Sequence, residues 1–202
     1  MNPKIISLGY ALPDKSYTQA ELFDMLGYKS QRVKRIFENS GIERRYLWSI
    51  PTGKSWQELT QEYERGAVEL SKRAILKCMD GQPLDKVGAL IFSSCTGYCC
   101  PGICHHLNRA LNLRDDIKHY NLLGQGCEGA SPDLSVAVDH VLSKGSWALV
   151  VSAEICSSAY FPAPEHDLEN TVVNCLFGDA AAAMLIGYDD VPYHPEIVDM
   201  QR

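Results

Sequence analysis

The strongest candidate for chemistry in this sequence is Cys127, which lies in the stretch LLGQGCEGAS. Glycines on both sides of the cysteine permit backbone angles closed to other residues. An apolar run precedes this turn, and a helical pattern follows it, with Pro132 and Asp133 suited to a first helical turn. A thiol placed there faces the positive end of the helix dipole, and neighbouring backbone N–H groups can hold an oxyanion. The pattern therefore predicts a nucleophilic cysteine.

Two other interpretations of the same turn stay open. A cysteine can serve as a small apolar residue of the core, without reactivity. A strand followed by a Gly-x-Gly turn and a helix can also bind phosphate with no thiol chemistry.

A second group of thiols and imidazoles is dense enough to raise the question of a metal site. It comprises Cys95, Cys99, Cys100, Cys104, His105 and His106. A structural zinc site needs four such ligands in a tetrahedral array, usually with paired C-x-x-C spacing. That spacing is missing here, and we expect no metal.

Three sets of carboxylates need an interpretation as well. We expect Asp179 to hold the turn before a buried strand. Glu154, at the end of an apolar segment, is either a general base near Cys127 or, as we favour, a structural carboxylate. The acidic residues around PAPEH, which are Glu165, Asp167 and Glu169, are typical of a solvated loop, and this loop could lie over a cavity mouth.

Composition excludes several classes of protein. The chain has 202 residues, of which 46% are hydrophobic, and its net charge is −6. It contains no long basic tract, which argues against a nucleic-acid surface. The first residues resemble neither a signal peptide nor a membrane span. We therefore expect a cytoplasmic protein whose eight cysteines are reduced thiols.

The elements that must position Cys127 alternate along the chain. Apolar runs predict strands at 4–8, 87–93, 117–123, 147–153 and 180–186. Helical spacing and caps predict helices at 18–26, 29–39, 55–79, 101–111, 130–142 and 168–177. This alternation predicts an α/β fold with a parallel or mixed sheet covered on its faces. Chemistry in such sheets gathers where strands end and helices begin, and Cys127 lies at such a junction.

Four motifs in this order resemble the thiolase superfamily, and most closely its chalcone synthase-like type III polyketide synthases. They are CTGYCCPG at 95–102, GQGC at 124–127, SAEIC at 152–156 and LFGDAAAA at 176–183. The early segment SGIERRY at 40–46 resembles related ketosynthases. The resemblance implies a thiolase-like layered fold, of which residues 1–202 would form a single domain, the N-terminal half of the duplicated α-β-α-β-α architecture.

The resemblance also implies roles for particular residues. Cys127 would carry the acyl chain as a thioester, and Phe177 would line the passage into the substrate cavity. Cys100 would project across a homodimer interface into the neighbouring cavity. Arg44 and Arg45 could contact coenzyme A phosphates, although arginines after a helix are often only solvated.

Glu128 departs from the family pattern, which has a small or apolar residue after the nucleophile. A carboxylate pointing toward Cys127 would oppose ionisation of the thiol and influence the choice of substrate.

A further departure is the missing second half. In the family that half supplies a histidine and an asparagine for decarboxylation, and neither motif is present here. The resemblance implies an acyltransferase that takes coenzyme A or acyl-carrier thioesters, binds no cofactor and performs a decarboxylative Claisen condensation. Either a second chain supplies the histidine and asparagine, or this sequence is a piece of a longer protein; we favour the second chain and expect such units to form a dimer. A non-catalytic companion subunit and a thioester hydrolase are the alternatives.

Overall fold

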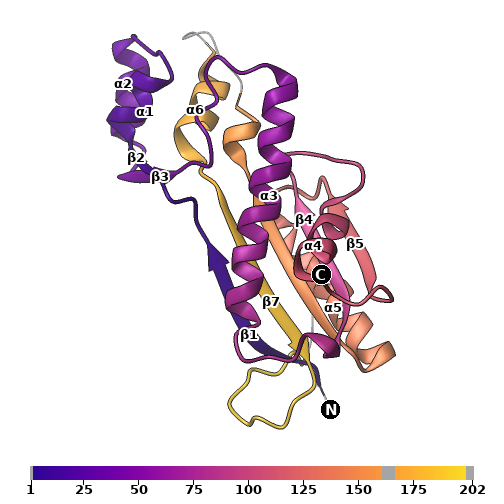
Figure 1. The fold of residues 1–202 in the computed structure, drawn as a ribbon. Coiled ribbons are helices and arrows are strands. Elements are labelled where there is room, and N and C mark those ends of the chain that lie inside the picture. Colours follow the sequence, from indigo (N-terminus) through magenta and orange to yellow (C-terminus); the bar gives the residue numbers. More distant parts are fainter. Residues whose placement is uncertain (1, 161–166, 199–202) are drawn as a thin grey trace.

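The computed structural model describes residues 2–160 and 167–198, and its centre is a five-stranded mixed sheet (Figure 1). The strand order is β1-β7-β6-β4-β5. Its strands are β1 (Lys4–Ala11), β4 (Val87–Ser94), β5 (Lys118–Leu123), β6 (Trp147–Glu154) and β7 (Ala180–Gly187). β4 is parallel to β5 and β6, whereas β7 is antiparallel to β1 and β6. The prediction of a mixed sheet is therefore confirmed.

Helices cover this sheet on both faces. They are α1 (Gln19–Met25), α2 (Gln31–Glu38), α3 (Trp56–Cys78), α4 (Ile103–Leu111), α5 (Ala130–Lys144) and α6 (Leu168–Leu176). α3 and α4 share a core with one face, and α5 packs on the other face over β4 and β6. In Figure 1, α1 and α2 form a pair at one end of the sheet, beside α6. This pair has its own small core.

Short elements complete the fold. They are the strands β2 (Ser16–Thr18) and β3 (Arg44–Tyr46), which form an antiparallel pair, and the 3-10 helices η1 (Leu84–Lys86), η2 (Gly126–Glu128) and η3 (Cys156–Ser158). None of these was predicted, because elements of three residues are too short to establish a hydrophobic period.

The longest helix, α3, begins at a reciprocal cap. The Ser55 side chain accepts a hydrogen bond from the Glu58 backbone N–H, and the Glu58 carboxylate accepts one from the Ser55 backbone. α3 then crosses β1 so closely that a Cβ added to Gly9 would lie 2.2 Å from the backbone oxygen of Ala74. A glycine at this position is what allows the helix to lie directly on the strand.

The predicted boundaries needed small corrections. The helix expected at 101–111 begins at Ile103, because Gly102 keeps an extended backbone as its N-cap. The helix expected at 130–142 continues to Lys144 and ends at Gly145, whose positive φ of 71° suits a helix terminus. The first strand extends from the predicted Leu8 to Ala11, because it pairs with β7 along its whole length.

One part of the sheet is left bare on the α5 side. Leu8 of β1 is 65% exposed, and its partner Met184 of β7 is half-buried. Ala180 and Ala182 on the same side of β7 are exposed, whereas the alternate residues Ala181 and Ala183 are buried under α3. We call the surface formed by Leu8, Ala180, Ala182 and Met184 the β1–β7 face. None of the helices among the described residues is long and apolar enough to cross a membrane.

Candidate active site

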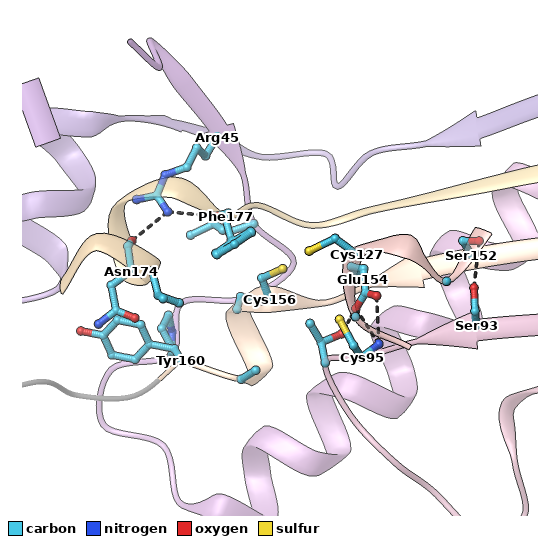
Figure 2. Close-up of a pocket in the computed structure, with 18 of the residues that line it drawn as sticks. Arg45, Ser93, Cys95, Cys127, Ser152, Glu154, Cys156, Tyr160, Asn174 and Phe177 are labelled. Carbon is cyan, nitrogen blue, oxygen red and sulfur yellow. Dashed lines mark hydrogen bonds between the residues drawn. The ribbon is translucent and has the colours of Figure 1, made fainter. Parts of the chain in front are cut away.

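A cavity of about 400 Å³ lies at the carboxyl ends of the parallel strands β4 and β6 (Figure 2). This is the edge of the sheet where the sequence predicted chemistry. Its wall includes Ser93, Cys95, Ser152, Glu154, Cys156, Tyr160, Asn174 and Phe177, together with Cys127 and the glycines beside it. The volume falls within the range of small-molecule sites, and the wall is mostly apolar with a few converging polar groups.

Cys127 stands in the turn that joins β5 to α5. Gly124 and Gly126 have φ angles of 75° and 67°, the left-handed region that glycine adopts at no steric cost. The turn forms η2 and continues into α5, whose N-terminus carries no side-chain cap. The Cys127 side chain is exposed and lines the cavity, so the structure places the predicted nucleophile at a helix N-terminus facing open space.

Two further thiols face the same cavity, and the sequence reasoning did not single them out for this role. Figure 2 shows Cys95 and Cys156 on either side of Cys127. Cys95 is exposed overall, but partial desolvation of its thiol, aided by the Glu154 carboxylate, raises its pKa to about 11. Burial, aided by Asp179, raises the pKa of Cys156 to about 12. Both thiols are therefore protonated near neutral pH, which argues against either as the nucleophile.

Glu154 has the structural role that we favoured. Its carboxylate accepts hydrogen bonds from the Cys95 backbone N–H at 2.9 Å and from the Thr96 hydroxyl at 2.7 Å. Thr96 Oγ1 in turn accepts from the Ile155 backbone N–H at 2.9 Å. Glu154 thus ties the end of β6 to the loop after β4, and these two segments carry the two flanking thiols.

Asp179 also holds a turn, as predicted. This buried carboxylate accepts hydrogen bonds from the Trp48 backbone N–H at 2.6 Å and from the Ser157 hydroxyl at 2.6 Å. Burial raises the pKa of Asp179, while these donors oppose the shift. The carboxylate therefore fixes the segment after β6 against the start of β7.

The expectation that Arg45 is an exposed arginine is wrong, although the residue does line the cavity. Its side chain is 6% exposed. Its Nη1 donates to the carbonyl oxygens of Asn174 at 2.8 Å and Phe177 at 2.7 Å, and its Nε donates to Gln19. The tertiary fold turns this residue inward, where a cation favourably meets the carbonyls at the C-terminus of α6. Arg45 thereby holds the backbone of Phe177, whose half-exposed side chain lines the cavity.

The other predicted site residues lie outside the cavity wall. Arg44 is exposed and donates to the Ser16 hydroxyl and carbonyl, and Cys100 is exposed just before Pro101. Glu128 is exposed and does not line the cavity. Successive residues of a 3-10 turn point about 120° apart, so Glu128 and Cys127 face different directions. The geometry therefore gives no support to a substrate contact by Glu128.

The dense cysteine and histidine group does not converge. Among residues 2–160 and 167–198, no three His, Cys, Asp or Glu side chains come together in a way that could hold a metal ion. Cys104 is buried under β4, whereas Cys95 and Cys100 are exposed. Of the acidic loop, Glu165 lies outside the described residues, and Asp167 forms the N-cap of α6.

A buried polar cluster near the turn was missed by the sequence reasoning. Asp133, assigned only to a first helical turn, is completely buried and meets Ser152, which is paired with Ser93 across β4 and β6. The sequence did contain a signal for this cluster, because Asp133 is a carboxylate within an otherwise apolar helix face.

The fold and the site together define a thiolase-like α/β unit with a cysteine at the end of its sheet. The description "Chalcone and stilbene synthases, N-terminal domain" matches residues 48–190. The chain therefore belongs to the chalcone and stilbene synthase family, the type III polyketide synthases, and the resemblance seen in its motifs is confirmed.

Similar proteins agree with this assignment. The chain is 31% identical over 194 residues to a 3,5-dihydroxyphenylacetyl-CoA synthase of Streptomyces toyocaensis, covering 91% of this chain and 49% of that protein. It is 28% identical to the synthase of the same name from Amycolatopsis orientalis, covering 91% and 52%. The chain thus spans about half the length of these relatives.

A solved structure shows the same fold. The C-terminal type III polyketide synthase domain of Steely1, a type I/III hybrid from Dictyostelium, superposes with a TM-score of 0.84 at 21% identity. The match covers 96% of this chain and 58% of that one. It confirms the predicted thiolase-like architecture.

Proposed function

We propose that this chain is an acyltransferase of the polyketide synthase type, in which Cys127 carries the acyl chain as a thioester. The observation that carries the proposal is the position of Cys127, exposed in the cavity at the uncapped N-terminus of α5. Partial burial, together with the Glu154 carboxylate at Cys95 and the Asp179 carboxylate at Cys156, raises the pKa of both flanking thiols and keeps them protonated. Cys127 is therefore the cavity thiol best suited to act as the nucleophile.

The proposed reaction begins with a coenzyme A or acyl-carrier thioester and requires no bound cofactor. The sulfur of Cys127 attacks the thioester carbonyl, backbone N–H groups at the start of α5 stabilise the oxyanion, and the carrier thiol leaves. A malonyl unit then loses carbon dioxide, and its carbanion attacks the acyl carbonyl and releases Cys127. Phe177 would border the acyl chain, and exposed Arg44 would meet the phosphates of coenzyme A.

We propose that a second chain supplies the histidine and asparagine that promote decarboxylation. Two observations support this. The curated relatives are about twice as long as the matched region. The β1–β7 face exposes apolar side chains that favour burial against another protein surface. Such units would pair into dimers, with Cys100 reaching the neighbouring cavity.

Cytoplasmic location is also a proposal. All eight cysteines are free thiols, as expected in a reducing compartment.

An acylation experiment tests the nucleophile. Purified protein is incubated with acetyl-CoA or malonyl-CoA, and intact mass spectrometry measures the adduct. We expect an adduct on wild type and on Cys99→Ala, a thiol outside the cavity wall, and none on Cys127→Ala. An adduct that persists in Cys127→Ala would refute the assignment. Release of free acid without a lengthened product would instead indicate the thioester hydrolase alternative.

Native mass spectrometry of the complex isolated from source cells tests the second chain. A partner of similar size would support a two-chain synthase. Normal turnover of that complex with Cys127→Ala would instead establish a non-catalytic companion subunit.

A further inference from the structure

A chain of hydroxyl groups connects the cavity wall to a buried carboxylate. Ser93 donates a hydrogen bond to the Ser152 oxygen at 3.0 Å, and Ser152 donates to Oδ2 of Asp133 at 3.3 Å. Ser93 and Ser152 line the cavity, and Figure 2 shows the bond between them. Asp133 is completely buried in the first turn of α5. The three side chains thus lead from the cavity into the core.

The cavity end of this chain touches the turn that carries Cys127. A Cβ added to Gly129 would lie 3.2 Å from the Ser93 hydroxyl oxygen, so the turn packs directly on Ser93. The Asp133 backbone N–H also donates to the Gly129 carbonyl at 3.2 Å. Gly129 is therefore linked to Asp133 through both the backbone and the serine chain.

The surroundings of Asp133 also disfavour its charged form. Its Oδ1 has no hydrogen-bond partner among the described residues, and burial raises its pKa to about 6. The groups around it are the two serines, the Cys104 thiol of α4, whose pKa burial raises to about 12, and Cys127 and the exposed Glu128 of η2, which packs against α5. β4 and β7 contain no ionisable residue, and Glu154, at the end of β6, is tied to the loop after β4. Asp133 is therefore the completely buried carboxylate of this cluster, and it changes charge in mildly acidic solution.

We propose that Asp133 is a positioning residue that sets the direction of the hydrogen bonds beneath the Cys127 turn. When it is a carboxylate, both hydroxyls donate toward Asp133, and the Ser93 oxygen is left as an acceptor facing the turn. When it takes up one proton from solvent, its O–H donates to Ser152. The order of donors then reverses, and the Ser93 hydrogen points toward the turn. The cavity wall would thus change from acceptor to donor near pH 6.

The direct test is a pH titration of the Gly129 amide by NMR on ¹⁵N-labelled protein. We expect its chemical shift to titrate with a midpoint near pH 6 in wild type, and to lose this transition in Asp133→Asn. Ser152→Ala breaks the serine chain but retains the carboxylate and its backbone link to Gly129, so it should reduce the amplitude of the transition markedly. Ser71→Ala removes a buried hydroxyl of α3 outside the cavity wall and should keep it.

Alkylation of Cys127 by iodoacetamide gives the chemical readout. Peptide mass mapping follows the rate at Cys127 separately from the other thiols. We expect a step of about threefold near pH 6, the size that one reversed hydrogen bond implies, in wild type but not in Ser152→Ala. A Gly129 transition that keeps its full amplitude in Ser152→Ala, or is missing from wild type, would overturn the proposal.

This inference relies on Cys127 being the reactive thiol of the proposed function only for the alkylation readout. Failure of Cys127 to react at any pH would count against that function. The Gly129 titration would still decide the role of Asp133.

Discussion

Under α3 the central sheet is sealed by small and apolar residues, whereas its opposite face holds a buried carboxylate under α5 and is bare at the β1–β7 face. Gly9, Ala181 and Ala183 let α3 lie close to the strands. On the other face, Asp133 meets hydroxyl groups, and Leu8 meets solvent. The difference teaches that close packing holds this fold together on one face, while polar chemistry and association are left to the other.

The sealed face should be the less tolerant of added volume. Gly9→Ala places a methyl group 2.2 Å from the Ala74 oxygen and 2.5 Å from the Cys78 nitrogen, and both of these are backbone atoms of α3. We expect a loss of roughly 3 kcal/mol or more in the free energy of unfolding, because the helix must move. Urea denaturation measures it.

Gly27→Ala is the control for this change. Gly27 has a φ of 80°, and no atom lies within 4 Å of an added Cβ, so only backbone strain of about 1 kcal/mol is expected. Equal losses for the two variants would show that α3 is not closely packed on β1.

The face under α5 should carry a dependence on pH. Burial raises the pKa of Asp133 from 3.8 to about 6, so the folded state binds its proton more tightly than the unfolded state does. The contribution of Asp133 to stability therefore falls by about 2–3 kcal/mol as pH rises from about 4 to 6, and it stays constant above pH 6. Unfolding of wild type and Asp133→Asn across this range measures the difference. Parallel curves for the two proteins would contradict it.

The β1–β7 face should tolerate a charged side chain when the protein is studied without a partner. Leu8→Lys changes a residue that is 65% exposed, and we expect an effect below about 0.5 kcal/mol on unfolding. The same variant should weaken association with a second chain, measured by native mass spectrometry. Leu185→Lys, on the buried side of β7, should prevent stable folding. A large loss of stability in Leu8→Lys would mean that the β1–β7 face is packed within this chain.

The sequence predicted the sheet, the long helices and the position of Cys127, because each depends on local patterns. Apolar runs mark β4 and β6, and the glycines around Cys127 mark a turn of unusual backbone geometry. The inward orientation of the Arg45 side chain could not be predicted from local patterns. It depends on carbonyls of α6, more than a hundred residues away, which the tertiary fold brings to it.

The cavity wall was predictable only in part for the same reason. Phe177 came from a resemblance between motifs, whereas Cys95 and Cys156 face Cys127 because two parallel strands end at one edge of the sheet. The hydroxyl chain to Asp133 depends on the register that pairs Ser93 with Ser152, and no single segment encodes that register.

The buried Arg45 joins parts of the chain that would otherwise open independently. Through it, Gln19 of α1 is linked to the last turn of α6, and Gln19 also donates to the Cys175 carbonyl at 2.8 Å. The small core of α1 and α2 includes Cys175 as well. The helical pair and this side of the cavity should therefore behave as one cooperative unit of local unfolding. Backbone amides of α1, α2 and α6 should exchange hydrogen for deuterium together, ahead of those of the central strands.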